Sequence, residues 1–335
     1  MNWSEVLAKL TAGVDLSRSE ARAALDDIMS GRATAAQTSA FLVSLRIKGE
    51  TAEEMAGLVE TMRAVGIRVS IGEPVVDTAG TGGDRSGTFN ISTTAALIAA
   101  GAGAKVAKHG NRSASSKCGS ADVLEALGVG IELDPEETAE MVTEAGFGFF
   151  FAPRYHPAMK YVVPIRRQLA IPTVFNFLGP LTNPAGATRQ LIGVYDSRMA
   201  ERMIRVLSRL GTERALVVHA DDGLDEVSVS GPTRGFQLVD GEVTPVVLTP
   251  EDFGLDPADV SELIGGDAET NAGILRAVLA GETGPRRDAA VANAAATLMV
   301  AGLAESPAEG ARSAARSIDS GAAAAVLDRV IKLSR

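Results

Sequence analysis

Two glycine- and hydroxyl-rich loops carry the residues best suited to chemistry in this sequence. The first spans residues 80–84 as GTGGD, and the second spans residues 108–120 as KHGNRSASSKCGS. Each loop follows a short apolar run and precedes an apolar helical stretch, so that backbone N–H groups at helix N-termini would face an anion. Two such loops facing each other predict a substrate that carries more than one phosphate group.

The first loop, taken alone, leaves two interpretations open. Its glycines would let the backbone approach an anion closely, and residues 90–93 (NIST) open a helix whose first-turn N–H groups lack intrahelical partners. The loop has no Gly-Lys-Ser/Thr sequence after it and no G-x-G-x-x-G in register. A tight turn followed by an ordinary helix start therefore explains it as well as a phosphate site does.

The second loop favours phosphate binding more strongly. The cations Lys108, Arg112 and Lys117 lie with four serines inside thirteen residues. Phosphate recognition uses this mixture of N–H groups, hydroxyls and cations, and a merely solvated loop seldom needs all of them. Within the loop, we interpret His109 as a positioning residue rather than a general base, and Cys118 as packed and inert.

An acidic stretch and an arginine pair offer further candidates without settling which member acts. Asp221-Asp222 and Asp225-Glu226 follow a predicted strand, and adjacent carboxylates suit Mg²⁺, which keeps water and substrate oxygens as its other ligands. Acidic surface loops are common, and composition alone favours that interpretation. Either of Arg166 and Arg167 could hold a carboxylate, and nothing in the local sequence distinguishes them.

Composition limits the class of protein. The chain has 335 residues, of which 46% are hydrophobic, so it is long enough for two domains with a sizeable core. Its net charge of −10 argues against a broad nucleic-acid surface. One cysteine excludes an intrachain disulfide. The N-terminus has no signal pattern and no apolar run reaches membrane-spanning length, so a cytoplasmic protein without membrane contact is expected.

The elements that must position these loops fall into two parts. The first 66 residues predict helices only, with stop signals at Gly31, Gly49 and Gly66. Each helix in this part begins with a capping box, in which a Ser or Thr precedes a Glu or Gln by three residues. The three boxes are Ser17 with Glu20, Thr34 with Gln37, and Thr51 with Glu54.

From Pro74 onward, short apolar runs alternate with helical stretches, which predicts a largely parallel sheet covered by helices on both faces. The predicted strands are Val75–Val76, Lys105–Ala107, Gly130–Leu133, Phe147–Phe151, Leu191–Tyr195 and Ala215–His219. Residues 236–247 predict a hairpin, and Pro285 suits the first turn of a helix in the alanine-rich tail. The proline-rich residues 163–184 predict a crossing back to the helical part.

Seven motifs together resemble the anthranilate phosphoribosyltransferases of the tryptophan pathway. They occur in the order AGTGGD, NIST, KHGNRSASS, GSADVLEALG, HPAMK, NFLGPLTNP and DGLDEVS, and they span most of the chain. The resemblance implies an α/β fold of the nucleoside phosphorylase/phosphoribosyltransferase type, with a small all-helical N-terminal domain and a larger domain built on a mostly parallel central sheet covered by helices. It also implies a substrate cleft between the domains and a homodimer.

The resemblance further implies which residues belong to each domain. Residues 1–72, with part of 163–184, would form the helical domain and supply the dimer contact and the anthranilate side. Residues 73–162 and 185–335 would form the α/β domain that binds phosphoribosyl diphosphate. The enzyme would transfer the phosphoribosyl group of 5-phospho-α-D-ribose 1-diphosphate to anthranilate, with Mg²⁺ as cofactor and pyrophosphate as the second product.

Site residues carry over motif by motif. The anthranilate positions are Gly80, Asn111 and Arg166, and the Mg²⁺ positions are Ser92, Asp225 and Glu226, so the resemblance chooses Asp225-Glu226 over Asp221-Asp222 and Arg166 over Arg167. The positions that would bind phosphoribosyl diphosphate are Gly80, Gly83, Asp84, Thr88, Asn90, Ile91, Ser92, Thr93, Lys108, His109, Gly110, Asn111, Arg112, Ser113, Ala114, Ser115, Ser116 and Ser120.

Two alternatives remain at this point. A pyrimidine nucleoside phosphorylase-like enzyme would share the architecture and a related glycine loop, but it would use free phosphate and a nucleoside. A non-catalytic relative that binds a nucleotide or a nucleic acid would keep the fold without turnover. The KHGNRSASS motif and the Asp225-Glu226 pair speak against the first, and the acidic balance speaks against nucleic acid.

Overall fold

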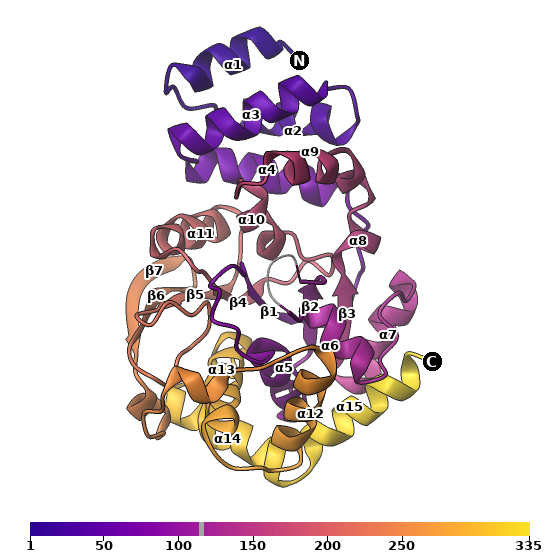
Figure 1. The fold of residues 1–335 in the computed structure, drawn as a ribbon, viewed down its shortest axis with the longest axis vertical. Coiled ribbons are helices and arrows are strands. Elements are labelled where there is room, and N and C mark those ends of the chain that lie inside the picture. Colours follow the sequence, from indigo (N-terminus) through magenta and orange to yellow (C-terminus); the bar gives the residue numbers. More distant parts are fainter. Residues whose placement is uncertain (114–116) are drawn as a thin grey trace.

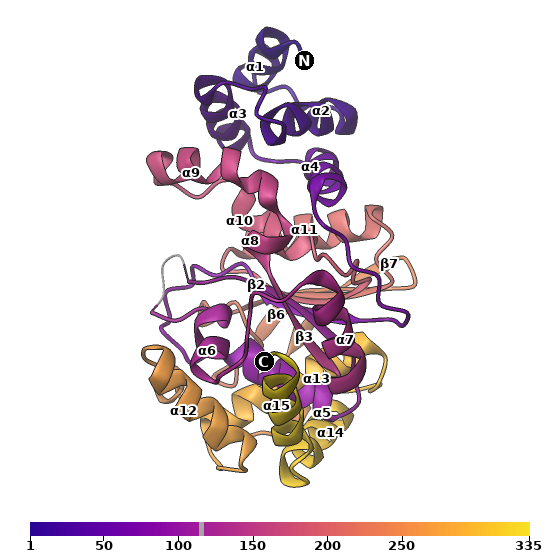
Figure 2. The same cartoon turned by 90° about the vertical axis from the view of Figure 1, so that its right-hand side faces the viewer.

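A computed structural model describes residues 1–113 and 117–335, so Ala114, Ser115 and Ser116 of the second loop lie outside the described residues. The chain forms a helical part at the N-terminus and a larger α/β part built on a central sheet (Figure 1). Figure 2 shows the helical part standing over one face of that sheet. In the part of the chain that the structure describes, no helix is long and apolar enough to cross a bilayer.

The predicted capping boxes all form and begin three of the N-terminal helices. Ser17, Thr34 and Thr51 each accept a hydrogen bond from the backbone N–H three residues later, and the Glu or Gln at that position reaches back to the cap. Gly49 and Gly66 end two of these helices, as predicted. The helices are α1 (Trp3–Thr11), α2 (Arg18–Met29), α3 (Ala35–Lys48) and α4 (Ala52–Val65).

The described residues form a seven-stranded sheet in the order β3-β2-β1-β4-β5-β6-β7, in which β3 to β5 run parallel and β6 and β7 pair antiparallel. The predicted hairpin forms, and its turn has positive φ at Asp240 and Gly241, as a two-residue turn of type I′ requires. The strands are β1 (Val76–Gly80), β2 (Val106–Gly110), β3 (Phe147–Phe151), β4 (Arg189–Gly193), β5 (Arg214–Ala220), β6 (Thr233–Val239) and β7 (Glu242–Leu248).

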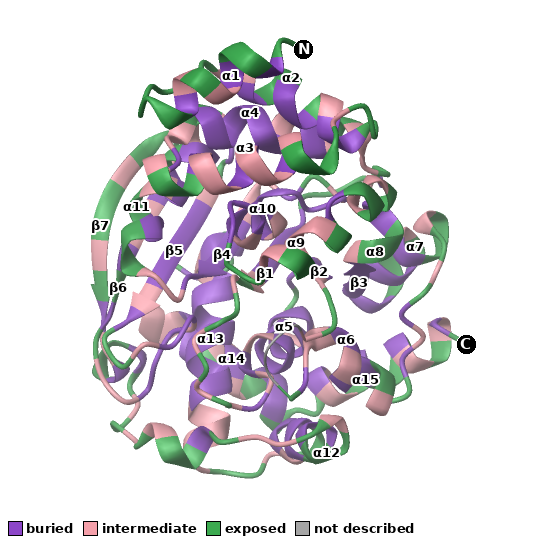
Figure 3. Cartoon of the chain, turned by 45° about the horizontal axis from the view of Figure 1, so that its top comes forward, coloured by how far each residue is buried: buried purple, intermediate pink, exposed green. Residues whose placement is uncertain are grey.

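Helices cover both faces of the sheet, which confirms the predicted α/β class. Helices α5 and α13 pack directly on one face, with α12, α14 and α15 outside them, while α10 and α11 lie on the other face (Figure 2). Colouring by burial shows α5 and much of α13 as buried (Figure 3). Their bounds are α5 (Ile91–Gly101), α6 (Ser120–Ala126), α7 (Pro135–Ala145), α8 (Ala152–Tyr155), α9 (Val163–Leu169), α10 (Phe175–Leu178), α11 (Ser197–Arg209), α12 (Ala268–Leu279), α13 (Pro285–Ala301), α14 (Pro307–Asp319) and α15 (Ala322–Leu333).

The proline-rich crossing returns to the helical part, as its sequence predicts. Helix α9 contacts α3, and α10 contacts α4. The buried side chains of Phe175, Phe177 and Leu178 share one apolar core with the N-terminal helices and with α11. The crossing thus sits between the helical bundle and the sheet, where it can present residues to both.

One predicted strand is wrong. Residues 130–133 pair with no strand among the described residues and instead form an irregular connection between α6 and α7. The Gly130 N–H donates to the Ser334 hydroxyl at 2.9 Å, and Ile131 is buried in the core. The apolar run reflects packing beneath the C-terminal helix, which sequence pattern alone cannot distinguish from a buried strand.

This contact predicts a stability effect. A Cβ at Gly130 would lie 2.3 Å from the Ser334 carbonyl oxygen, so Gly130→Ala must displace the end of α15 and should cost about 1–3 kcal/mol of unfolding free energy, as overpacking does. Urea unfolding measures the effect. Gly72→Ala is the control, because no atom of the described chain lies within 4 Å of its added Cβ. Equal stability of the two variants would contradict the packing described.

Candidate active site at the carboxyl ends of the strands

The candidate loops meet at one edge of the sheet because the strands that precede them are parallel. The GTGGD loop follows β1, the KHGNR segment contains the end of β2, and the Asp225-Glu226 segment follows β5. Carboxyl ends of parallel strands share one edge, and ligands of open α/β sheets bind there. The fold therefore brings together three segments that are far apart in the sequence.

Asp225 fastens the first loop to the acidic segment. Its Oδ2 accepts a hydrogen bond from the Gly82 N–H at 2.6 Å. The strand ends beneath it must be glycine: a Cβ at Gly80 would lie 2.6 Å from this same oxygen, and a Cβ at Gly193 would lie 1.7 Å from the Asp225 carbonyl oxygen. Close approach to Asp225 is thus a specific reason for two of the glycines, independent of any ligand.

Glu226 binds the N-terminus of α5. Its Oε1 accepts from the Ser92 N–H at 3.2 Å, in the first turn of the helix, where N–H groups lack helical partners. Lys108 completes this group from β2: its Nζ donates to the Thr78 carbonyl at 2.6 Å and lies 3.3 Å from the Ser92 hydroxyl. Lys108 is buried, so in this structure it organises the site from beneath.

The electrostatics of this group favour a bound cation. Burial, together with repulsion from Asp84, raises the pKa of Asp225 to about 7. Burial, together with repulsion from Asp225, raises the pKa of Glu226 to about 8. Burial lowers the pKa of Lys108, although the same acids oppose that shift. Two desolvated carboxylates beside one desolvated ammonium leave negative charge uncompensated, which an added cation would relieve.

The donor set fits Mg²⁺ in particular. Asp225, Glu226 and the Ser92 hydroxyl offer oxygen ligands, and Mg²⁺ is commonly bound through one or two carboxylates plus substrate phosphates. Across residues 1–113 and 117–335, no three acidic, His or Cys side chains converge into a ready-made metal cage.

The neighbouring acids Asp221 and Asp222 have structural partners instead. Asp221 pairs with Arg234 at 2.9 Å on the surface. Asp222 accepts from the Leu224 N–H and from the hydroxyls of Ser228 and Ser230, which holds the turn before the site. These contacts support the choice of Asp225-Glu226 and show that Asp222 stabilises the loop that presents them.

The second loop lies against helix α6. Arg112 pairs with Asp122 at 3.1 Å and with Glu125, and its guanidinium lies 5.7 Å from the Phe151 ring centroid. The Ser120 hydroxyl donates to the Asn111 carbonyl at 3.2 Å. Arg112 thus holds its loop to α6 in this structure, and it would have to exchange partners to contact a phosphate.

His109 faces away from Asp225, Glu226 and Lys108. It lies on β2 rather than in the loop, and neighbouring residues of a strand point to opposite faces, so His109 points toward the crossing while Lys108 points toward α5. Its Nδ1 lies 3.1 Å from the Gly179 carbonyl oxygen, and its ring lies 5.2 Å from that of His156. Burial lowers the pKa of His109 to about 3 and that of His156 to about 4, so both rings are neutral at pH 7.

The remaining residues of the first motif divide by burial. Thr88 bridges to Ile264 before α12, and Asn90 accepts from the amide of Asn271 within α12 at 2.9 Å, so both tie this segment to the α12 region. Ile91 and Thr93 are buried within the fold and can offer a ligand only their backbone. The Asp84 carboxylate accepts from the Ser86 hydroxyl at 2.7 Å, within its own turn.

The structure distinguishes the two arginines of the crossing. Arg167 is exposed, whereas Arg166 is half-buried on α9 with its guanidinium 5.5 Å from the Phe175 ring centroid and 3.3 Å from the Asn176 amide oxygen. Burial lowers the pKa of Arg166, but the group stays charged. A positioned, partly desolvated guanidinium is suited to bind a carboxylate.

Two buried polar residues at the site escaped the sequence reasoning. The Asp77 carboxylate accepts from the His109 N–H at 3.1 Å, and the Asn183 amide donates to the Ala107 carbonyl at 2.7 Å. A charged residue directly after the predicted strand Val75–Val76 was the available signal for Asp77. Asn183 lies in NFLGPLTNP but has no local feature that predicts its partner 76 residues away.

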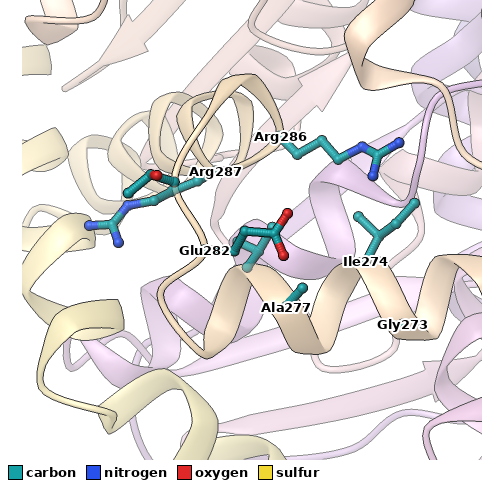
Figure 4. Close-up of a pocket in the computed structure, with 8 residues that line it drawn as sticks. Gly273, Ile274, Ala277, Glu282, Arg286 and Arg287 are labelled. Carbon is teal, nitrogen blue, oxygen red and sulfur yellow. The ribbon is translucent and has the colours of Figure 1, made fainter.

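One surface hollow of the described chain lies away from this site. A cavity of about 190 Å³ between α12 and the start of α13 is lined by Gly273, Ile274, Ala277, Glu282, Arg286 and Arg287, among others (Figure 4). None of the motif residues described above lines it.

A helical bundle over a mostly parallel sheet, with two phosphate-type loops and paired carboxylates at the strand ends, defines a transferase that acts on a phosphorylated sugar. Family models agree: residues 4–66 match "Glycosyl transferase family, helical bundle domain", and residues 72–324 match "Glycosyl transferase family, a/b domain". The class is therefore that of the glycosyltransferases.

Individual relatives narrow the class. The anthranilate phosphoribosyltransferase of Rhodopseudomonas palustris (strain BisA53) is 51% identical over 334 residues, covering 100% of this chain and 98% of the relative. That of Rubrobacter xylanophilus is 52% identical over 332 residues, covering 99% and 97%. The chain belongs to the anthranilate phosphoribosyltransferase family.

Solved structures agree with the family. The Thermus thermophilus enzyme superposes with a TM-score of 0.93 at 42% identity, covering 98% of this chain and 99% of that one. The Saccharomyces cerevisiae enzyme "in complex with PRPP and Mg" gives a TM-score of 0.89 at 30% identity, covering 99% and 97%. Together with the family relationship, this likeness favours the anthranilate phosphoribosyltransferase over the nucleoside phosphorylase and the non-catalytic alternatives.

The buried carboxylate pair predicts a charge-dependent site. Asp225→Asn with Glu226→Gln keeps the shape but removes both charges, so Mg²⁺-dependent turnover should fall by roughly 100-fold or more. Steady-state rates against Mg²⁺ concentration measure this. Asp221→Asn is the control, because it removes an acid of the same segment whose partner is a surface arginine. Native turnover in the double variant would reject the metal site.

Proposed function

We propose that this protein transfers the phosphoribosyl group of 5-phospho-α-D-ribose 1-diphosphate to anthranilate in tryptophan biosynthesis, and that the residues at the strand ends perform the step. The observation that carries this proposal is the pair of the buried Asp225 and the half-buried Glu226, bonded to the Gly82 and Ser92 N–H groups. The two carboxylates are of the kind that binds Mg²⁺, and each is hydrogen-bonded to a backbone segment of the kind that binds an anion. The family relationship supports the reaction.

The two loops would bind the donor at its opposite phosphate ends. Glycines 82 and 83 have positive φ and expose their backbone, and the first turn of α5 directs N–H groups toward the same edge of the sheet. Such groups stabilise negative charge without reorganising. We expect the segment from Lys108 to Ser120, including Ala114–Ser116 outside the described residues, to close the other side of the donor.

The metal site complements these loops. Asp225, Glu226 and Ser92 would hold Mg²⁺, which when bound supplies positive charge to the departing diphosphate. The protein's own contribution is to keep both carboxylates desolvated and fixed by backbone donors, so that their charge is directed at one point.

The acceptor would be held from the crossing. Arg166 on α9 would bind the anthranilate carboxylate, with Gly80 and Asn111 completing that position, and would direct the amine toward C1 of the ribose. The neutral amine attacks as the C1–O bond breaks, pyrophosphate leaves, and the nitrogen then loses a proton to water. The leaving group is already good, so no covalent nucleophile and no strong base are required.

Domain arrangement, assembly and location complete the proposal. Residues 1–72 with part of 163–184 would act as one body that closes over the donor and excludes water. Apolar side chains are exposed on the helical side at Ile47 on α3, Val163 at the start of α9 and Ile171 after its end, which supports a homodimer there. A biosynthetic enzyme with a single cysteine suits the cytoplasm.

The reaction is tested by anthranilate fluorescence. We expect the signal to fall when phosphoribosyl diphosphate and Mg²⁺ are both present, and to stay constant when either is left out. A parallel assay supplies inorganic phosphate and a pyrimidine nucleoside. Nucleoside cleavage without anthranilate consumption would overturn the proposed reaction.

Arg166 provides a test of the acceptor position. Arg166→Ala removes a charge-assisted contact to one substrate, so the KM for anthranilate should rise by roughly 10- to 100-fold while the KM for the donor stays within about twofold. Arg167→Ala, an exposed neighbour on the same helix, is the matched control. Equal changes in both KM values would contradict the assignment of Arg166.

A further inference from the structure

Strands β1 and β2 separate just before the site. Among the described residues, β1 and β2 pair only at Val76↔Val106. By contrast, β1 and β4 stay paired from Val76↔Arg189 to Gly80↔Gly193. On the outer side, β2 and β3 stay registered from Val106↔Phe147 to Gly110↔Phe151. The gap therefore opens between the two strands that carry the substrate loops.

Three side chains replace the backbone hydrogen bonds that β1 and β2 do not make with each other. If the parallel ladder continued past Val76 and Val106, the Thr78 N–H would bond the Ala107 carbonyl and the His109 N–H would bond the Thr78 carbonyl. Instead, three side chains take these backbone groups. The His109 N–H donates to Asp77 Oδ1 at 3.1 Å, the Thr78 carbonyl accepts from Lys108 Nζ at 2.6 Å, and the Ala107 carbonyl accepts from Asn183 Nδ2 at 2.7 Å.

The replacement works from both faces of the sheet. Lys108 lies on the α5 face, where it also contacts Ser92, while Asp77 lies on the face that meets the crossing, as Asn183 does. Asp77 is fully buried, and burial raises the pKa of its carboxyl to about 6 although neighbouring donors oppose that shift. Burying a carboxylate between two strands is costly, which indicates that the Asp77–His109 contact serves a purpose beyond stability.

We propose that Asp77 is a positioning residue for the transfer reaction. By accepting the His109 N–H, its carboxylate holds the end of β2 away from β1 and so sets the spacing between the GTGGD loop and the Lys108–Asn111 segment. That spacing determines whether one donor molecule can contact both loops. The inference rests on the proposed function and adds a residue that touches neither substrate.

Loss of the carboxylate should let the strands close. Without it, the nearest backbone acceptor for the His109 N–H in a parallel ladder is the Thr78 carbonyl, which Lys108 occupies. Competition for this carbonyl would displace Lys108 from Ser92 and carry Asn111 toward β1. Donor binding should therefore weaken even in molecules that are fully folded.

The test compares three variants of the full-length protein. Asp77→Ala removes the acceptor, Asp77→Asn keeps an oxygen acceptor of the same shape, and Thr138→Val removes a different buried hydrogen bond, between Thr138 and Tyr155. We expect the donor KM to rise by about tenfold or more in D77A and to stay within about threefold in D77N and T138V. Melting temperatures show whether D77A and T138V are comparably destabilised.

Hydrogen exchange supplies a readout that does not depend on activity. The His109 amide should exchange about tenfold faster or more in D77A than in the native protein, and at a near-native rate in D77N. If D77A does not fold, Asp77→Ser, whose hydroxyl is too short to bridge the strands, takes its place. A native KM for the donor in D77A or D77S would overturn the proposal and assign Asp77 to stability. The same conclusion would follow if D77N folded while D77A and D77S did not.

The native protein separates this inference from the proposed function. If native protein consumes no anthranilate with the donor and Mg²⁺, the proposed function fails and the kinetic comparison has no reference. If it does turn over and D77A binds the donor normally, only the role of Asp77 fails.

Discussion

The site depends on one constraint: at the edge of the sheet, two carboxylates share a desolvated region with a single ammonium group. Asp225 and Glu226 are held out of water beside Lys108, so any stable arrangement must surround them with donors. The structure does so with backbone: the Gly82 N–H for one acid and the first turn of α5 for the other. The need for close approach then excludes side chains at Gly80 and Gly193. Features that look like separate motifs in the sequence thus form one electrostatic unit.

The second constraint is that the unit must serve two substrates. In the proposed function, the donor would lie at strand ends whose positions are fixed by the ladder between β1 and β4. The acceptor would be held from α9, which belongs to a segment packed against the helical bundle. The two substrates would then contact different parts of the chain, so that the donor could bind before the proposed closure.

The sequence predicted features that depend on near neighbours. Capping boxes, the Asp240-Gly241 turn and the helix that begins at Pro285 are local, and all of them form. Residues 130–133 were misassigned because burial beneath α15 produces the same apolar run as a strand. Local sequence could not choose Asp225-Glu226 over Asp221-Asp222 either, since the difference lies in distant partners such as Ser92 and Arg234. The role of Asp77 needed the register of two strands, which no motif encodes.

The path of the chain through the crossing has a mechanical consequence. Because α9 and α10 share a core with the N-terminal helices, the backbone joins the bundle to the sheet at residues 66–75 and again on both sides of the crossing. In the proposed closure, a helical part held by several connections would move only along a narrow arc. A protease cut in the first connection would leave the bundle still attached to the rest of the molecule. The connections themselves would therefore set the direction of closing.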